Sequence, residues 1–267
     1  MDDTPRPTRF DAATYGRSFA DVYDQWYPAD ANTDATVQRV GSLAAAAAAE
    51  RSGQQRDAGR PTRILELGVG TGRLALPLAA LGHQVIGMDS SADMLELLAA
   101  KGDGVRTVLG DVADPDAWPQ GPFDVVVAAF NLLFNLAEEG AQQRLFDASA
   151  VALGDEGFLV IEAFLPAPLE MTERRLEVRE VTLGGVVMIA TDASPDTGLV
   201  TGQHIELRDG EPVRLRPWRI RVSVPEEIDR RAAQAGLQLV ERHADWAARP
   251  FDLHGTAHVS VYRRTPA

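Results

Sequence analysis

A glycine-rich turn between an apolar strand and a helix constrains the fold of this chain more strongly than any other segment. Residues 63–67 read Arg-Ile-Leu-Glu-Leu, which indicates a buried strand, and residues 73–80 carry a helical pattern. The turn between them, Gly68–Gly72, has glycine at every second position. Ligands of doubly wound sheets bind at such a turn, at the carboxyl end of the first strand. We therefore expect an α/β fold with a binding site here.

The segment around this turn alternates short apolar runs with helical stretches. Strands are expected at residues 63–67, 84–88, 105–109, 123–129 and 157–163. Helices are expected between them, at residues 73–80, 91–100 and 139–153. Continuous apolar strands separated by helices indicate a parallel sheet that is covered on both faces. Right-handed crossovers make that sheet doubly wound.

The flanking segments predict additions to this sheet. Two helices are expected before it, at residues 11–27, with an aromatic stripe, and at residues 33–50. Four strands are expected after it, at residues 176–183, 186–191, 199–208 and 213–224. Turn signals such as Asp209-Gly210 separate them. A helix and two closing strands follow, at residues 225–235, 237–246 and 257–263.

The predicted fold class is therefore α/β. It is a doubly wound, Rossmann-like seven-stranded sheet with an N-terminal helical lid and an antiparallel β-sheet inserted after strand five. The predicted organisation assigns the lid to residues 1–60, the ligand-binding core to 61–170, the β insertion to 171–224 and the closing elements to 225–267.

Charge and composition exclude several classes of function. Asp and Glu outnumber Lys and Arg by 39 to 26, and a net charge of −13 disfavours binding to nucleic acid or anionic membranes. Cysteine is absent, which excludes thiol nucleophiles and thiolate metal sites. No run approaches the roughly 20 apolar residues of a membrane span, so we expect a cytoplasmic protein. His254 and His258 are four residues apart, but Gly255 argues against a helix there, so no metal is expected.

The glycine spacing distinguishes two cofactors. A dinucleotide fingerprint needs a third glycine three residues after Gly70, where Arg73 stands. The string from Glu66 to Gly72 instead resembles motif I of class I S-adenosylmethionine-dependent methyltransferases. That resemblance implies that Asp89, at the end of the second strand, binds the ribose and that Asp111 meets the adenine. The cofactor contacts implied in this way are Tyr15, Tyr23, Glu66, Gly68, Gly70, Gly72, Asp89, Ser90, Met94, Asp111, Val112 and Phe130.

The N-terminal segment extends the resemblance. Residues 15–27 are similar to the first helix of small-molecule methyltransferases of bacterial secondary metabolism, and match the amino-sugar N-methyltransferases best. In that group tyrosines of this helix close over the cofactor and the acceptor, which implies these roles for Tyr15 and Tyr23 and an acceptor contact for Tyr27. The inserted sheet implies a cap over the acceptor and a surface for a homodimer.

The loop after the fourth strand is expected to hold the acceptor. Phe134 and Asn131 are candidate acceptor contacts, and Trp218 of the insertion could stack on a ring or a sugar. Where the amino-sugar enzymes imply a histidine base, this chain has Asn135, which cannot abstract a proton. Either the acceptor needs no base or the base comes from elsewhere, for which His204 and His254 are the candidates.

Four arginines in one predicted strand have two interpretations. Arg214, Arg216, Arg219 and Arg221 form either a solvated sheet face or a guanidinium clamp for an anionic acceptor. A carboxylate acceptor would need no base, which makes the clamp relevant to the chemistry.

The favoured function is a methyltransferase that uses S-adenosylmethionine, leaves S-adenosylhomocysteine, and methylates a small natural-product-like acceptor, at oxygen in preference to nitrogen. The alternatives are an N-methyltransferase of an amino sugar and a carboxylate O-methyltransferase of a short peptide. Two further alternatives belong to other classes of protein: a nicotinamide-dependent oxidoreductase and a non-catalytic binding module.

Overall fold

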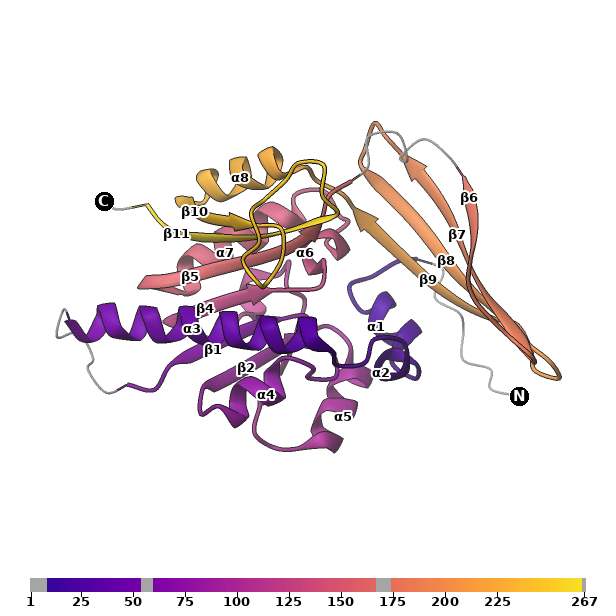
Figure 1. Cartoon of the computed structure of the whole chain (residues 1–267), viewed down its shortest axis with the longest axis horizontal. Helices are drawn as coiled ribbons and strands as arrows, with labels where there is room; N and C mark the ends of the chain where they lie inside the picture. The colour runs from indigo at the N-terminus through magenta and orange to yellow at the C-terminus, as the bar shows by residue number, and fades with distance from the viewer. Residues whose placement is uncertain (1–8, 54–59, 167–173, 266–267) are drawn as a thin grey trace.

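Two sheets with helices around them make up the protein (Figure 1). The structure, a computed structural model, describes residues 9–53, 60–166 and 174–265. The larger sheet has the strand order β10-β11-β5-β4-β1-β2-β3. Its strands are β1 (Arg63–Leu67), β2 (Gln84–Asp89), β3 (Arg106–Leu109), β4 (Phe123–Ala128), β5 (Leu153–Phe164), β10 (Leu237–His243) and β11 (Ala257–Arg264).

Six of the seven strands point the same way, and β11 alone is antiparallel to its two neighbours, β5 and β10. The order reverses between β1 and β4, so the carboxyl ends of these two strands open a crevice. The predicted doubly wound sheet of seven strands is confirmed, and its two closing strands, β10 and β11, lie at the expected residues.

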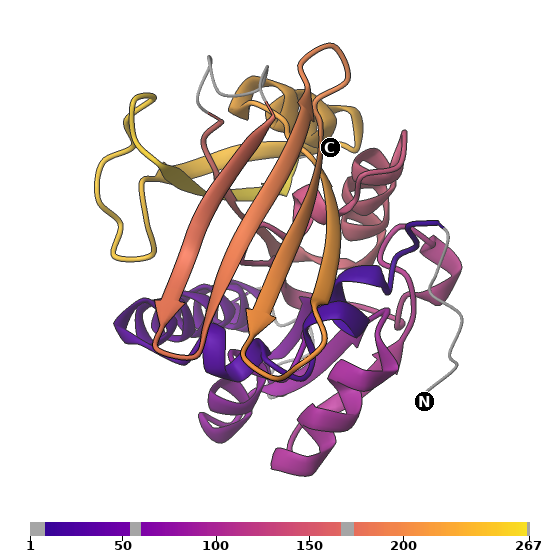
Figure 2. The same cartoon turned by 90° about the vertical axis from the view of Figure 1, so that its right-hand side faces the viewer.

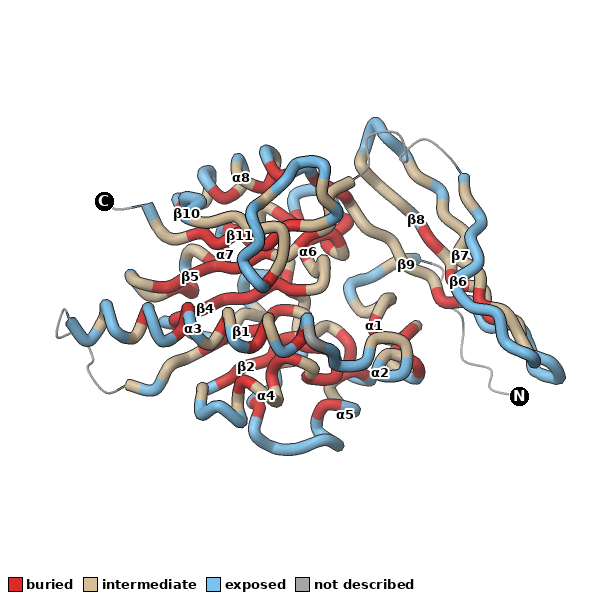
Figure 3. Tube along the Cα trace, in the orientation of Figure 1, coloured by how far each residue is buried: buried red, intermediate tan, exposed pale blue. Residues whose placement is uncertain are grey.

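Helices cover both faces of the larger sheet (Figure 1). One face is covered by α3 (Ala31–Gly53), α4 (Ala75–Ala80) and α5 (Ala92–Lys101), and the other by α6 (Leu132–Asn135), α7 (Ala141–Ala152) and α8 (Pro225–Gln234). A short 3-10 turn, Pro115–Ala117, follows β3. The buried residues lie mostly along the central strands and the helix faces turned to them (Figure 3).

The second sheet is the predicted insertion. Its antiparallel strands are β6 (Arg175–Thr182), β7 (Gly185–Ser194), β8 (Leu199–Arg208) and β9 (Arg214–Arg221). Seen from its own side, this sheet covers the N-terminal helices (Figure 2). Both ends of the insertion meet α6: Phe164 packs against Phe134 at 4.8 Å, and Gln142 Nε2 donates to Leu133 O and to Arg221 O. The predicted boundary at residues 170/171 lies outside the described residues.

The expected helix over residues 11–27 is wrong as a single element. The structure has α1 (Thr14–Phe19) and α2 (Tyr23–Trp26) instead. The Ser18 carbonyl accepts a hydrogen bond from Arg216 of β9 rather than from a following helical N–H, and Asp21 pairs with Arg214 and Arg216. These tertiary contacts end α1, and the periodicity of one segment does not report them.

No helix in the described ranges combines the length and the apolar character that crossing a bilayer requires.

Candidate active site

The glycine turn and the end of β2 form the base of the site. Gly68, Gly70 and Gly72 have positive φ angles of 63°, 54° and 86°. A Cβ at Gly68 would lie 2.5 Å from Leu132 Cδ1, so only glycine allows this close approach. The Gly70 N–H donates to Asp89 Oδ2 at 2.8 Å, and the Ser91 N–H donates to Asp89 Oδ1 at 2.9 Å. The turn and the strand-two carboxylate therefore hold each other in place.

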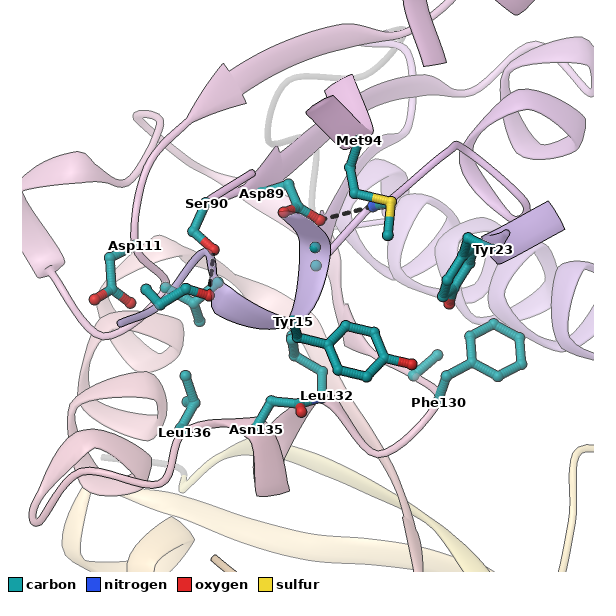
Figure 4. A pocket seen from close by; sticks show the side chains of 16 residues that line it. Tyr15, Tyr23, Asp89, Ser90, Met94, Asp111, Phe130, Leu132, Asn135 and Leu136 are labelled. Atoms are coloured by element: carbon teal, nitrogen blue, oxygen red, sulfur yellow. Dashed lines mark hydrogen bonds between the residues drawn. The ribbon is translucent and has the colours of Figure 1, made fainter. Parts of the chain in front are cut away.

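A cavity opens above this turn, and many of the predicted cofactor residues meet there (Figure 4). The members of the predicted set that line it are Tyr15, Tyr23, Gly68, Gly70, Asp89, Ser90, Met94, Asp111, Val112 and Phe130. Asn135 lines it as well. Glu66 and Gly72 do not line it and lie in or beneath the turn. We name this space the cofactor cavity.

Buried carboxyl groups suit a cationic, hydroxyl-rich ligand. Glu66 is 4% exposed, its burial raises its pKa to about 8, and its Oε2 has no hydrogen-bond partner in the described part of the protein. Burial also raises the pKa of Asp89, against the lowering by backbone N–H groups of Ser91 and Gly70. Asp111 Oδ1 accepts from the Ala113 N–H, and its side chain lines the cavity. Ribose hydroxyls and an amino group would supply further donors to the oxygens of Asp89 and Asp111, which line the cavity.

The lid, which we define as α1 and α2, closes the cofactor cavity. Tyr15 stacks on Phe19 at 4.5 Å, and burial raises the pKa of Tyr15 well above its ordinary value. Burial also raises the pKa of Tyr23. Both phenols therefore stay protonated near neutral pH and act as neutral donors. The Tyr27 ring centroid lies 5.2 Å from that of Tyr23, and Tyr27 is not among the residues that line the cavity.

Polar contacts dock the lid on the core. Asp24 Oδ1 accepts from Thr71 Oγ1 at 2.5 Å, and Asp24 Oδ2 lies 2.6 Å from Lys101 Nζ. Ser90 Oγ donates to Ala12 O at 2.8 Å, just before α1. The lid is thereby tied to the glycine turn and to the loop after β2.

A left-handed turn after β4 forms another wall. Phe130 and Asn131 have φ angles of 50° and 61°, which are unusual without glycine. Glu162 Oε2 accepts from the Phe130 N–H at 2.7 Å, and Asn131 Oδ1 accepts from the Phe164 N–H at 2.7 Å. Asn131 is thus used to hold the turn. Phe134 is fully buried in the core, so neither predicted acceptor contact lines the cavities described here.

Two residues near this wall were not predicted from the sequence. The Arg73 guanidinium lies 3.5 Å from the Phe130 ring centroid, and Arg73 Nη1 donates to Tyr27 O. Glu162 is the other, and its burial raises its pKa. The signals were present: Arg73 directly follows the glycine turn, and Glu162 interrupts the apolar run of residues 158–164.

A second cavity adjoins the first, and we name it the acceptor cavity. It shares Ala12, Tyr15, Asp111, Asn135 and Leu136 with the cofactor cavity. Trp218 lines it, as do five charged residues, which are Asp11, Asp111, Glu138, Arg144 and Arg219. Asn135 lines both cavities, so it lies where a cofactor bound in the first cavity would meet an acceptor molecule bound in the second.

The two candidate histidine bases lie outside both cavities. His204 is buried against Phe19 and Trp26, and its Nδ1 accepts from Trp218 Nε1 at 3.1 Å. Burial, together with Arg179 and Arg216, lowers its pKa to about 4. His254 is exposed in the loop before β11. Over the described ranges no group of three His, Asp or Glu side chains is arranged to hold a metal ion.

Comparison with known proteins points to one kind of enzyme. The family model described as a methyltransferase domain matches residues 64–157. The structure of the CcbJ methyltransferase from Streptomyces caelestis is 37% identical, with a TM-score of 0.84, and the alignment covers 96% of this chain and 100% of that one. An uncharacterized methyltransferase from Geobacillus kaustophilus is 29% identical over 60% of this chain and 76% of that protein. CalS10, an amino pentose methyltransferase from Micromonospora echinaspora, shares the fold at 18% identity, with a TM-score of 0.60 over 98% of this chain and 100% of that one.

Proposed function

Because this chain belongs to the S-adenosylmethionine-dependent methyltransferases, we propose that it methylates an amine nitrogen of a small natural-product-like acceptor. The acceptor would occupy the acceptor cavity and meet the methyl group between Tyr15 and Asn135. One observation carries the choice of nitrogen. Among the described residues, those that line the two cavities include tyrosines, carboxylates and Asn135, and none is a histidine.

The acid–base properties of the cavity walls favour an amine over an alcohol as the acceptor group. An alcohol must lose a proton with a very high pKa, and a carboxylate side chain is far too weak a base for that step. An amine needs only to lose the extra proton of its ammonium form, which Asp111 or water can accept. After that its lone pair is the nucleophile. The proposed acceptor atom is therefore nitrogen, in place of the oxygen that the sequence favoured.

The residues of this chain would then bind and align the reactants. S-adenosylmethionine supplies an electrophilic methyl group on a cationic sulfur. Asp89 and Asp111 would accept from its hydroxyl and amino groups, and the lid tyrosines exclude water. Holding the nucleophile in line is the main source of acceleration for such a displacement. Asn135 would orient the acceptor by hydrogen bonding.

Structural neighbours support this choice of acceptor. A sugar N-methyltransferase and a glycopeptide N-methyltransferase share the fold, in addition to the amino pentose enzyme. A carboxylate oxygen is the second candidate, because it needs no base and because arginines line the acceptor cavity.

Methyl transfer to a probe panel tests the proposal. The protein is incubated with methyl-labelled S-adenosylmethionine and a panel of amino sugars, amino acid amides, carboxylic acids and alcohols. We expect base-stable N-methyl products. Base-labile methyl esters alone would favour the second candidate, and methyl ethers alone would contradict the argument from the missing base.

A homodimer through the inserted sheet is part of the proposal. The sheet face turned away from the lid carries Leu176, Val178 and Leu215, which are each at least half exposed. The register places Val178 beside Met188 of β7, so these apolar side chains form one face. Light scattering after size exclusion should give twice the chain mass, and Val178→Lys should give the monomer.

A further inference from the structure

We infer that Arg219 is a specificity-determining residue whose guanidinium binds an anionic oxygen group of the acceptor, a carboxylate or a phosphate. This inference rests on the proposed acceptor cavity and adds to it the chemical class of the acceptor: an amine that carries an anionic group at a distance from the nitrogen. Arg219 lies in the part of the acceptor cavity that the cofactor cavity does not share.

The structure separates Arg219 from the other arginines of β9. Arg214 pairs with Asp21, and Arg216 is buried between Asp21 and Glu206. Arg221 donates to Ala137 O at 3.0 Å and to Thr197 O at 2.6 Å. These three guanidinium groups are used to hold the lid and the insertion. Among the four, Arg219 alone lines the acceptor cavity.

The guanidinium of Arg219 has an incompletely used edge. Its Nη2 donates to Glu138 Oε1 at 3.3 Å, whereas its Nε is buried and has no hydrogen-bond partner within the described ranges. Nε and Nη2 together form the edge that matches the two oxygens of a carboxylate. A buried N–H without a partner carries a desolvation cost. An anionic oxygen group of the acceptor would bind both Nε and Nη2, whereas Glu138 accepts from Nη2 alone.

The partner that holds this edge now is easily displaced. The Glu138 side chain is 73% exposed, and exposed ion pairs contribute little stability. The Phe10 ring lies 5.0 Å from the guanidinium carbon and supports it from one face. An incoming carboxylate would therefore replace a weak contact on an arginine that is already oriented.

The charges around the cavity fit an amine at one end and an anion at the other. Asp111 lies on the wall that the two cavities share, on the side expected for the amine. Asp11 is engaged by Arg17 at 2.8 Å and does not compete for Arg219. Arg144 adds a second cation to the lining, held by its donation to Ala113 O at 2.8 Å. The anion would thus be received on the side of Arg219.

Matched probe pairs test the inference. The pairs are 4-(aminomethyl)benzoate with 4-(aminomethyl)benzamide, and glucosamine 6-phosphate with glucosamine. Their binding to the protein saturated with S-adenosylhomocysteine is measured by titration calorimetry. We expect the anionic member of at least one pair to bind about tenfold more tightly to the unmodified protein. Arg219→Gln should abolish this preference, and Glu138→Gln should increase it because the competing carboxylate is gone.

Control variants separate recognition from folding. Arg230→Gln removes an arginine on α8 that is remote from the cavity and should leave every affinity unchanged. An intact affinity for S-adenosylhomocysteine shows that Arg219→Gln is folded. The inference is overturned if no pair shows a preference for its anionic member, or if Arg219→Gln weakens both members of a pair equally.

Product analysis distinguishes this inference from the proposed function. An Arg219-dependent preference in binding, with methyl esters or no methylated product, would refute the amine acceptor and leave anion recognition standing. N-methylation without any dependence on Arg219 would refute anion recognition by Arg219 and leave the amine acceptor standing.

Discussion

The cofactor cavity and the acceptor cavity share a wall but are built in different ways. The base of the cofactor side depends on backbone conformation, from the turn at Gly68–Gly72 to the loop after β3, and the lid and the turn after β4 complete its walls. The acceptor side depends on side chains from the lid, the α6–α7 region and β9, which ion pairs hold together. The cofactor side therefore tolerates few substitutions, whereas on the acceptor side single side chains can be replaced one at a time.

Arg216→Ala should have the largest effect and act on the acceptor side. Its guanidinium is buried between Glu206 and Asp21, and removal leaves a buried carboxylate with less compensation. We expect the free energy of unfolding to fall by about 3 kcal/mol, measured by urea denaturation. Arg214→Ala is the control, since its pair with Asp21 is exposed and should be worth under about 1 kcal/mol. Equal losses in the two variants would contradict this view of the lid contact.

Asp89→Ala should act on the cofactor side with little effect on the fold. Losing charged hydrogen bonds should weaken S-adenosylhomocysteine binding by about 1.5–3 kcal/mol, measured by titration calorimetry. Asp93→Ala, an exposed carboxylate in the first turn of α5, is the control and should bind normally. An unchanged affinity in Asp89→Ala would refute its role toward the ribose.

Glu66 should make the cofactor side sensitive to pH. Its pKa of about 8 in the folded protein lies above its ordinary value of 4.5, so folding favours the protonated form. The stability that this provides is complete below the ordinary pKa and is lost as pH rises through about 8. Between pH values of about 7 and 8 the free energy of unfolding should fall by about 1 kcal/mol.

Glu66→Gln provides the comparison for this pH dependence. The free energies of unfolding of the unmodified protein and the variant are measured by denaturation across this pH range. The difference between them should change with pH as expected for the titration of Glu66. A slope that survives in the variant would assign the pH dependence to another group.

Lys101→Ala should have the smallest effect, because the Lys101–Asp24 pair is partly exposed. We expect a loss of stability below about 0.5 kcal/mol, measured by urea denaturation. Stopped-flow measurement should show faster release of S-adenosylhomocysteine, since this pair docks the lid on the glycine turn. Lys101→Arg keeps the charge and should release it at nearly the normal rate. A release rate unchanged in Lys101→Ala would show that the lid does not need this contact.

The same contrast explains what the sequence could predict. Strands such as β1 and β4 are short and mostly apolar, and their alternation with helices predicted a parallel, doubly wound sheet. The cofactor residues follow from a local motif, because turn geometry depends on glycine at set positions. The residues after β2 and β3 then follow from their place at strand ends.

Long-range contacts set the limit of that prediction. The break between α1 and α2 depends on Arg216, which is almost 200 residues away in the chain. Asn131 looked like an acceptor contact, but its side chain is bound to the Phe164 N–H. Arg219 was one of four equivalent arginines until the structure showed which partners the other three have.

The attachment of the inserted sheet to α6 has an evolutionary consequence. The insertion leaves the core beside Phe134 and returns beside Gln142, so its two ends meet one short stretch of the core. A segment joined in this way can be lengthened, recombined or exchanged between related genes without shifting the strands that carry the glycine turn. Lineages of this enzyme can therefore diversify in acceptor while inheriting the same methyl-donor site.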